Sequence, residues 1–299
     1  MRTAVIDLGT NTFNILIVDI ENSKFNIVHT EKKGVALGKG GIHKNIISED
    51  AFDRGIETLH HFKCVCNQHK VDRINAFGTS ALRDASNAID FVSKVHEELG
   101  IRINIISGEK EAELIYKGVQ LSYSFNNPAV IMDIGGGSTE FIFANKEGVK
   151  EMVSLDIGIS RIYEKFKISN PAKPSEVKEV ENWLEKTSDN YFDNKTQKTL
   201  IGASGTFETF YELIFNITFP KTQKCIELPI DLLSVKLDKI IYSTDQQRKL
   251  NEYLIPIRKK LAPIAAIKTR WVLQKLKVKQ VFVSPCSLKE GAMLEESLD

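Results

Sequence analysis

The chain has 299 residues, of which 42% are hydrophobic and 26% are charged, a balance that excludes a disordered chain and is typical of about two globular domains. Forty basic and 39 acidic residues give a formal net charge of +1, so the overall charge indicates no nucleic-acid partner. No apolar run approaches the roughly 18 residues of a membrane span, Asp7 comes too early for a signal peptide, and the four cysteines are irregularly spaced. We therefore expect a cytoplasmic protein with no membrane partner.

The first half of the chain predicts three successive strands followed by alternating helices and strands. Short apolar runs predict strands at 4–6, 13–20 and 25–30. Ser48, followed by two acids, predicts a helix start, because a cap hydroxyl and acidic side chains suit the positive end of the helix dipole. The remaining expected elements are a strand at 74–77, a helix at 88–99, a strand at 101–106 and a helix from about 109 to 121.

The second half repeats this pattern. Strands are expected at 129–133, 140–144, 149–155, 199–203 and 280–283, and helices at 159–166, at 174–188, between the last two strands up to about 275, and at 288–296. The signal Asp-x-Gly at the end of a first strand occurs twice, at Asp7 and Asp133. The repeat predicts two α/β domains of similar topology, 1–123 and 124–287, with a cleft between them and with the C-terminal helix 288–299 as a candidate last element of the first domain.

A glycine-rich turn follows each of the two aspartates. Glycine leaves the backbone N–H groups open to converge on an anion, although glycine turns also make plain hairpins. Two such loops, each preceded by an aspartate, indicate a site that binds a phosphate chain together with a metal ion. Because Mg²⁺ prefers carboxylate and phosphate oxygens, Asp7 and Asp133 are candidate ligands, with turn capping as the alternative. The candidate phosphate-binding residues are Gly9, Thr10, Asn11, Thr12, Gly135, Gly136, Gly137, Ser138 and Thr139.

Two further residues suggest hydrolysis. Glu111 lies in the first turn of the helix that begins at Ser107-Gly108, where an acid usually interacts only with the helix dipole. A carboxylate that faces a bound phosphate chain there would also accept a proton from an attacking water. Arg83 follows the strand at 74–77 and is a candidate phosphate ligand, with a surface salt bridge as the alternative.

Taken together, these segments resemble the exopolyphosphatase / guanosine pentaphosphate phosphohydrolase family. The motifs are Asp7-Leu-Gly-Thr-Asn-Thr, Gly78-Thr-Ser-Ala-Leu-Arg83, Ile106-Ser-Gly-Glu-Lys-Glu111, Asp133-Ile-Gly-Gly-Gly-Ser-Thr-Glu140 and Gly202-Ala-Ser-Gly-Thr206, in the order of the family and over nearly the whole chain.

The resemblance implies the duplicated ribonuclease-H fold that is also found in actin and sugar kinases. It implies Mg²⁺-dependent hydrolysis, with Mn²⁺ as a substitute, of the terminal phosphate of inorganic polyphosphate or the 5′ γ-phosphate of guanosine pentaphosphate. By position, Glu111 resembles the catalytic glutamate and Arg83 the phosphate-binding arginine. Asp133 and Glu140 resemble the acids that position metal and water, and Gly205 and Thr206 join the phosphate-binding set.

Three residues depart from the family pattern. Lys110 stands where a second acid is usual, Gly34 replaces a basic residue, and Lys289 replaces an arginine. These departures bear on how active the chain is, not on the identity of the catalytic position.

An exopolyphosphatase is the leading interpretation. A guanosine pentaphosphate hydrolase using the same site is the first alternative, and a non-catalytic polyphosphate sensor is the second. A small sugar or acetate kinase is disfavoured, because the helix start at Ser107–Glu111 indicates water as the acceptor. A structural zinc site on the helix that carries His60 and Cys64 is also disfavoured, since no second ligand pair has the usual spacing. A homodimer is an expectation that rests on the fold class alone.

The segment from Tyr253 to Lys289 holds nine basic residues and no acid. A solvated helix face is the ordinary explanation. A polyanionic substrate suggests another, a track that guides the distal part of a long phosphate chain. The hypothesised track consists of Arg258, Lys259, Lys260, Lys268 and Arg270.

Overall fold

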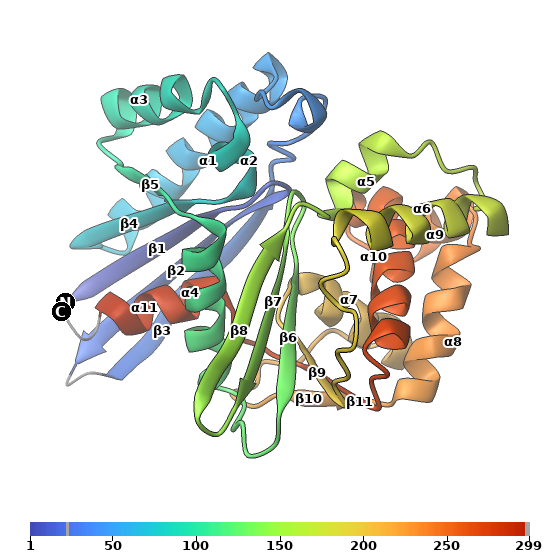
Figure 1. The fold of residues 1–299 in the computed structure, drawn as a ribbon. Helices are drawn as coiled ribbons and strands as arrows, with labels where there is room; N and C mark the ends of the chain where they lie inside the picture. The colour runs from blue at the N-terminus through green and yellow to red at the C-terminus, as the bar shows by residue number, and fades with distance from the viewer. Residues whose placement is uncertain (22–23, 297–299) are drawn as a thin grey trace. The chain divides into compact units, whose positions relative to one another are not determined.

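The computed structural model describes residues 1–21 and 24–296, which form two compact units, each built on one mixed β-sheet (Figure 1). Unit 1 comprises Met1–Gly118, Gly135–Gly137 and the C-terminal segment from Cys286, and unit 2 comprises Val119–Ile134 and Ser138–Pro285. The last three positions of the expected helix 288–299 lie outside the described residues.

The sheet of unit 1 has the strand order β3-β2-β1-β4-β5. The first three strands pair antiparallel, while β4 and β5 continue the sheet in parallel with β1. This arrangement is the ribonuclease-H-like topology that the family resemblance implies. The strands are β1 (Arg2–Leu8), β2 (Thr12–Glu21), β3 (Lys24–Gly34), β4 (Arg73–Gly78) and β5 (Ile103–Ile105).

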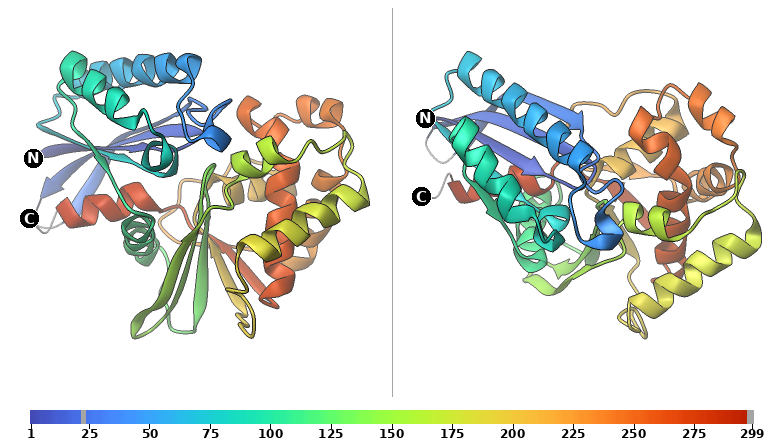
Figure 2. Two further views of the ribbon diagram at one scale, coloured as in Figure 1. Left: turned by 45° about the horizontal axis from the view of Figure 1, so that its top comes forward. Right: turned by 90° about the horizontal axis from the view of Figure 1, so that it is seen from above.

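Helices cover both faces of this sheet (Figure 2). One face carries α1 (Glu49–Gln68) and α3 (Ala88–Leu99), which bury Phe62 and Phe91 against the strands. The other face carries α4 (Gly108–Gln120) and α11 (Leu288–Glu296), and α11 packs on β1 and β2.

Helices α4 and α11 approach each other closely. A Cβ atom on Gly291 would lie 1.8 Å from the carbonyl oxygen of Leu114, and one on Gly118 would lie 2.0 Å from that of Ser287. The two glycines thus let the C-terminal helix pack backbone to backbone against α4, although the two helices are far apart in sequence.

The sheet of unit 2 has the order β10-β11-β9-β6-β7-β8. Strands β6, β7 and β8 form the antiparallel meander, and β9 and β11 extend it in parallel, as β4 and β5 do in unit 1. A short edge strand, β10, pairs antiparallel with β11. The bounds are β6 (Ala129–Ile134), β7 (Thr139–Asn145), β8 (Gly148–Leu155), β9 (Thr199–Gly202), β10 (Ile226–Leu228) and β11 (Gln280–Val283).

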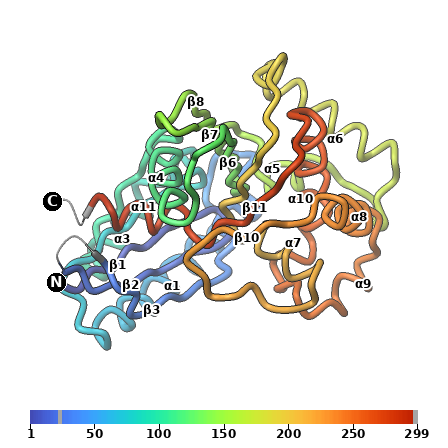
Figure 3. The backbone as a smooth tube through the Cα atoms, turned by 90° about the horizontal axis from the view of Figure 1, so that it is seen from below, coloured from blue at the N-terminus to red at the C-terminus, as the bar shows by residue number. Residues whose placement is uncertain are grey.

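Helix α10 is the central helix of unit 2 and packs against α5, α6, α8 and α9 (Figure 3). Its middle, from Leu261 to Leu273, is buried in the core of this unit. The helices are α5 (Ile159–Lys165), α6 (Pro174–Thr187), α7 (Gly205–Phe215), α8 (Ile230–Ile241), α9 (Asp245–Leu250) and α10 (Pro256–Lys275).

The predicted fold class, two ribonuclease-H-like α/β domains, is confirmed. Three short elements were not predicted: the 3₁₀ turn Ile42–Lys44, α2 (Ser80–Asp84) and β10. Each has five residues or fewer, too few for a hydrophobic period to be visible. Among the helices of residues 1–21 and 24–296, none combines the length and the apolar character that a membrane crossing requires.

Candidate active site

The two aspartates of the repeat lie at equivalent places, each near the end of the first strand of its sheet. Asp7 in β1 is opposite Asn14 in β2, whose Nδ2 donates a hydrogen bond of 2.9 Å to the carboxylate. Burial raises the pKa of Asp7 to about 6, and the Asn14 hydrogen bond and the charge of Lys289 oppose that rise. Asp133 in β6 is opposite Glu140 in β7. The repeat therefore places one carboxylate in unit 1 and two adjacent carboxylates in unit 2 at this position.

The first glycine loop is a tight turn held by its own backbone. The N–H of Gly9 donates to the carbonyl oxygen of Thr12 at 3.1 Å, and a Cβ on Gly9 would lie 2.9 Å from that oxygen. The carbonyl of Asn11 accepts hydrogen bonds from Val35 and Ala36. Because the Gly9 N–H is used inside the turn, the expectation that it joins an anion nest is corrected. Gly9 shapes the loop, and the side chains after it remain the candidates for phosphate contact.

The second glycine loop, Gly135–Gly137, packs directly against the first. A Cβ on Gly136 would lie 2.7 Å from Nδ2 of Asn11 and 2.8 Å from Cβ of Thr10, and one on Gly137 would lie 2.3 Å from Oγ of Ser80. Among the described glycines, positive φ occurs at Gly40, Gly100 and Gly148, so the need for glycine at position 136 is not conformational. Glycine is needed at 136 and 137 because the two loops touch. The structure thus brings together two predicted phosphate-binding segments that are far apart in sequence.

Arg83 and Glu111 form an ion pair within unit 1. Arg83 lies on α2 and Glu111 in the first turn of α4, and Nη1 of Arg83 donates to Oε2 of Glu111 at 3.1 Å. The same nitrogen donates to the carbonyl oxygen of Ile106 at 3.0 Å. Ser107 caps α4, since its hydroxyl accepts a hydrogen bond from the N–H of Lys110 at 3.1 Å. Glu111 is only 8% exposed, so its charge is held in a largely buried place by a cation on a neighbouring helix.

The three residues that depart from the family pattern each lie at a specific contact in unit 1. Lys110 forms ion pairs with Glu113 at 3.1 Å and with Glu295 of α11 at 2.6 Å. Lys289 forms an ion pair with Glu290 at 2.8 Å. Gly34 ends β3 opposite Thr12, at the base of the first glycine loop. Lys110 thus links α4 to α11 by its ion pair with Glu295.

In unit 2, a buried lysine of α10 contacts the start of β7. Lys268 of α10 is 0% exposed and donates to Oγ1 of Thr139 at 2.5 Å and to the carbonyl oxygen of Ile157 at 2.9 Å. Burial lowers the pKa of Lys268 to about 7, and the charges of Glu140 and Asp133 oppose that fall. Glu140 is 1% exposed and accepts a hydrogen bond from Ser154 at 2.7 Å.

The third glycine turn connects to the same end of β6. The hydroxyl of Ser204 accepts a hydrogen bond of 3.3 Å from the N–H of Ile134, and α7 begins at the next residue, Gly205. Thr206 follows in the first turn of α7. Binding of phosphate by Gly205 and Thr206 stays a prediction.

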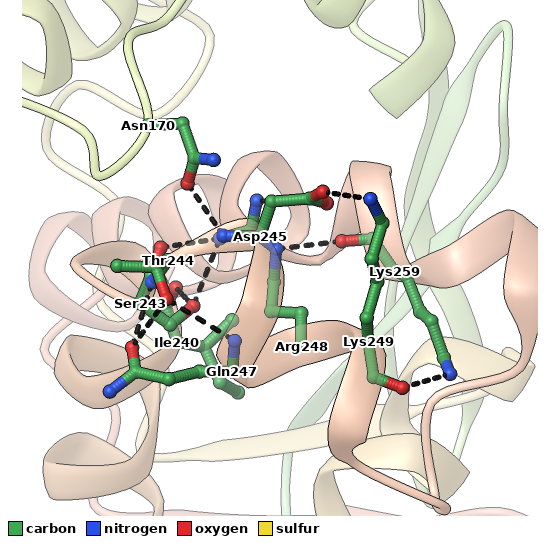
Figure 4. Close-up of polar contacts among 9 residues, drawn as sticks. All are labelled: Asn170, Ile240, Ser243, Thr244, Asp245, Gln247, Arg248, Lys249 and Lys259. Carbon is green, nitrogen blue, oxygen red and sulfur yellow. Dashed lines mark hydrogen bonds and ion pairs between the residues drawn. The ribbon is translucent and has the colours of Figure 1, made fainter.

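The five cations of the hypothesised track differ in their burial and in their hydrogen-bond partners. Arg258 is held by a hydrogen bond to the hydroxyl of Thr209, and burial lowers its pKa. Lys259 donates to the carbonyl oxygen of Lys249 at 2.6 Å, next to the ion pair of Lys249 with Asp245 (Figure 4). Lys260 is exposed and lines a cavity of about 230 Å³ beside α5 and α9.

For the other two cations, Lys268 and Arg270, the predicted role in the track is wrong. Lys268 is completely buried, so it cannot contact a polymer at the surface. Arg270 is bound to Asp238 at 2.8 Å and to Glu181 at 2.9 Å, so its charge is already paired. The helix phase of α10 turns both residues toward neighbouring elements of unit 2. The track therefore stays a hypothesis for the residues before position 261 only.

The burial of Lys268 was not predicted from the sequence. It could have been, because the residues at helical spacing from Lys268 are all apolar: Ile264, Ala265, Trp271 and Val272. A lysine in the middle of an apolar helix face indicates a buried cation rather than a surface one.

The described residues hold no group of three or more His, Cys, Asp or Glu side chains arranged for a metal ion. On the helix considered for zinc, His60 pairs with Glu98 at 3.0 Å and His61 pairs with Glu31 at 2.9 Å. A magnesium ion at Asp133 and Glu140 would therefore have to take its remaining ligands from phosphate and water, which is how Mg²⁺ is commonly bound beside phosphates.

The fold and these motifs define a phosphatase of the actin and sugar-kinase architecture. Residues 16–299 match the model of the Ppx/GppA phosphatase family, and the chain belongs to this family. Two solved structures are similar over nearly the whole chain. An exopolyphosphatase from Cytophaga hutchinsonii is 33% identical with a TM-score of 0.93, covering 99% of this chain and 98% of that one. The Aquifex aeolicus PPX-GPPA enzyme is 28% identical with a TM-score of 0.81, covering 99% of each chain.

Two curated relatives are similar over part of their length. A bifunctional 3-dehydroquinate synthase/phosphatase from Fusobacterium nucleatum is 34% identical over 220 residues, which cover 69% of this chain and 33% of that protein. A guanosine-5′-triphosphate,3′-diphosphate pyrophosphatase from Aliivibrio fischeri is 32% identical over 215 residues, covering 71% of this chain and 43% of that protein. The matched part of the chain thus spans less than half of the length of these relatives.

Proposed function

We propose that the chain hydrolyses the terminal phosphoanhydride bond of inorganic polyphosphate and releases orthophosphate. The observation that carries the proposal is the ion pair of Arg83 with the buried Glu111 at the capped start of α4. A carboxylate held in this way accepts a hydrogen bond from water, and a guanidinium beside it binds phosphate oxygens in its fork. The similarity to the Cytophaga hutchinsonii exopolyphosphatase over 99% of this chain supports the same substrate class.

In this proposal, water attacks the terminal phosphorus in line with the leaving phosphate. Negative charge spreads over the terminal phosphoryl oxygens as the bond breaks, and Arg83 stabilises that charge. Glu111 orients the water and takes its proton, a contribution of typically about 10²–10⁴-fold. No covalent nucleophile is required.

The glycine loops position the substrate. Thr10, Asn11 and Thr12 contribute hydroxyl and amide donors, and the loop Gly135–Gly137 packs on them without side chains that would obstruct the approach of a phosphate. Ser138, Gly205 and Thr206 are proposed as further phosphate donors in unit 2. The expectation for Thr139 is corrected, because its buried hydroxyl donates to the carbonyl oxygen of Ser138 and accepts a hydrogen bond from Lys268. Asp7, whose carboxylate accepts a hydrogen bond from Asn14 at the base of the first loop, stays a proposed metal ligand.

Magnesium fits the carboxylates of unit 2. Asp133 and Glu140 are cross-strand neighbours, so their side chains leave the same face of the sheet. Two carboxylates provide hard oxygen ligands, and phosphate oxygens and water would complete the octahedral shell. When bound, the ion would offset phosphoryl charge, and Mn²⁺ is proposed to replace it.

Guanosine pentaphosphate is the second candidate substrate. It is favoured by one observation, the 32% identity to the Aliivibrio fischeri guanosine-5′-triphosphate,3′-diphosphate pyrophosphatase over 71% of this chain. Both substrates end in a phosphoanhydride, so the same groups would act on either. A polyphosphate sensor without turnover remains the non-enzymatic alternative.

Phosphate release decides among these functions. The purified chain is incubated with Mg²⁺ and, separately, with long-chain polyphosphate, tripolyphosphate or guanosine pentaphosphate, and orthophosphate is measured over time. Faster release from polyphosphate at equal terminal-phosphate concentration supports the proposal, and preference for the nucleotide supports the second candidate. Binding of polyphosphate without release would establish the sensor and refute hydrolysis.

A further inference from the structure

A cavity of about 230 Å³ in unit 2 has a lining that the proposed hydrolysis does not use. The lining combines apolar side chains, among them Tyr163, Pro263 and Ile264, with two cations, Arg248 of α9 and Lys260 of α10. Ile264 belongs to the buried core of unit 2, so this part of the wall is firmly held. An apolar wall with a few placed polar groups is typical of a ligand site. Apart from Lys260 of the track hypothesis, the lining residues belong to none of the proposed functional sets.

Pro263 explains how Arg248 is held. Proline has no backbone N–H, so inside α10 it leaves the carbonyl oxygen of Lys259, four residues earlier, without its usual helical donor. Nε of Arg248 donates to this oxygen at 2.7 Å instead (Figure 4). Nη1 of Arg248 donates to the carbonyl oxygen of Ser243 at 2.5 Å and to its hydroxyl at 3.1 Å. Arg248 is only 9% exposed, so its guanidinium is both buried and fixed in one orientation by three hydrogen bonds.

This orientation leaves one nitrogen of Arg248 for a ligand. Within the described part of the chain, Nη2 donates no hydrogen bond, and its nearest acidic oxygen, Oδ1 of Asp245, is 3.9 Å away. The other oxygen of Asp245 is bound by Nζ of Lys249 at 2.6 Å. Glu176 accepts a hydrogen bond of 2.6 Å from the hydroxyl of Ser169, which lines the cavity. These two acids are therefore engaged with other groups and do not occupy the guanidinium.

Two further donors line the cavity from other segments. Lys260 is exposed, and residues 1–21 and 24–296 provide no hydrogen-bond or ion-pair partner for its ammonium. Asn170, in the segment before α6, accepts the N–H of Asp245 at 2.7 Å through its side-chain oxygen, and among the described residues its Nδ2 has no acceptor. Arg248, Lys260 and Asn170 thus offer donors from three segments. The net charge of the lining is positive, because Arg248 and Lys260 outnumber Asp245.

We propose that this cavity binds a small organic phosphate, a phosphate monoester with a compact apolar or aromatic group. The three terminal oxygens of a phosphate match donors from three segments, whereas a carboxylate has only two oxygens. The ring of Tyr163 and the side chains of Pro263 and Ile264 would contact the organic group. The volume is below the roughly 300–1,000 Å³ of sites for drug-sized ligands, which favours a compact monoester over a nucleoside polyphosphate.

The test is isothermal titration calorimetry of the full chain with phenyl phosphate, in the presence of a chelator so that no divalent ion takes part. In the wild type, phenyl phosphate should bind at least about tenfold more tightly than inorganic phosphate, because only the ester also contacts the apolar wall. Lys260→Gln should weaken the binding of phenyl phosphate at least about fivefold. The matched control, Lys279→Gln at another exposed lysine of unit 2, should leave it unchanged. Equal affinities of Lys260→Gln and the wild type would overturn the proposal.

Two further variants separate this cavity from the other phosphate sites. Tyr163→Ser should lower the affinity for phenyl phosphate toward that for inorganic phosphate, and an unchanged affinity would refute the role of the apolar wall. Arg83→Gln, which removes the proposed catalytic arginine, should bind phenyl phosphate as the wild type does. Loss of binding in Arg83→Gln would assign the ligand to the catalytic site, and benzoate that binds as tightly as phenyl phosphate would refute the choice of phosphate. The readout involves no turnover, so its outcome is separate from that of the hydrolysis assay.

Discussion

Nη1 of Arg83 donates a hydrogen bond of 3.1 Å to Oε2 of Glu111, although the two residues are 28 positions apart and lie on different helices. The same nitrogen is tied to the carbonyl oxygen of Ile106, just before the Ser107 cap of α4. The arginine is thereby oriented by the backbone at the start of the helix that carries the acid. A fixed guanidinium and a fixed carboxylate are what a hydrolytic site needs to bind phosphate and to hold water at the same time.

Glu111→Gln tests the proposed base. The amide retains the shape of the side chain but cannot accept a proton, so kcat should fall at least about 10²-fold with little change in KM. The matched control is Glu109→Gln, which removes an exposed acid from the same first turn and should leave kcat within about twofold. Steady-state phosphate release with polyphosphate measures both variants. A Glu111→Gln enzyme with nearly normal kcat would eliminate this residue as the base.

Gly136→Ala tests the contact between the two glycine loops. The new methyl group would lie 2.8 Å from Cβ of Thr10 and 2.9 Å from Cγ of Asn11, so the loops must move apart. We expect phosphate release to fall at least about tenfold, and Gly136→Val to abolish it, because displaced loops no longer present their donors to one phosphate. The melting temperature should change little for the alanine variant, since the loop lies outside the buried core clusters. Full activity of both variants would mean that the loop is only a hairpin.

The reduced track hypothesis is tested with Lys259→Gln/Lys260→Gln. Contacts along a polyanion release counterions, so the affinity for a long phosphate chain should fall steeply with salt, by analogy with nucleic acids. In the double variant, KM for long polyphosphate should rise and depend less on ionic strength, while KM for tripolyphosphate should stay unchanged.

Lys277→Gln/Lys279→Gln is the matched control for the track, because it removes two exposed cations from the same basic segment. It should leave both substrates unaffected. If long and short substrates respond alike to the change at 259 and 260, these lysines do not form a track.

Glu295→Gln tests how α11 is held on α4. Oε1 of Glu295 accepts hydrogen bonds from Lys110 at 2.6 Å and Lys117 at 2.5 Å. Partial burial raises the pKa of Glu295, but the two lysines outweigh it and hold the pKa below its usual range. A lowered pKa of an acid stabilises the folded state above the ordinary pKa of glutamate and loses that effect as the pH falls.

The variant should therefore lose about 0.5–1 kcal/mol of unfolding free energy at pH 7, as expected for a partly exposed ion pair. Its stability should also fall less than that of the wild type between pH 5 and pH 3. Urea unfolding at several pH values measures both effects. Glu252→Gln, a change at an exposed acid of unit 2, serves as the control, and an identical pH profile for the two variants would refute the role of Glu295.

Much of the fold could be predicted from local patterns in the sequence. The helices Ala88–Leu99 and Leu288–Glu296 and the strand Gln280–Val283 have the predicted bounds, because each is long enough or apolar enough for its period to appear in the sequence. The Asp-x-Gly repeat likewise predicted two sheets of one topology, since strand order in such units follows from short connections and right-handed crossovers. The candidate residues Glu111, Arg83 and Asp133 came from motifs, which are local by nature.

Contacts between distant segments could not be read in that way. The ion pair of Arg83 with Glu111, the packing of Gly136 on Asn11 and the burial of Lys268 each depend on how helices and strands meet in the folded chain. For Lys268, the charge alone suggested the surface, whereas the phase of α10 turned the side chain into the core toward Thr139. Periodicity along the chain predicts which elements form, but only tertiary packing decides which side chains share a low-dielectric interior and therefore which charges must balance one another.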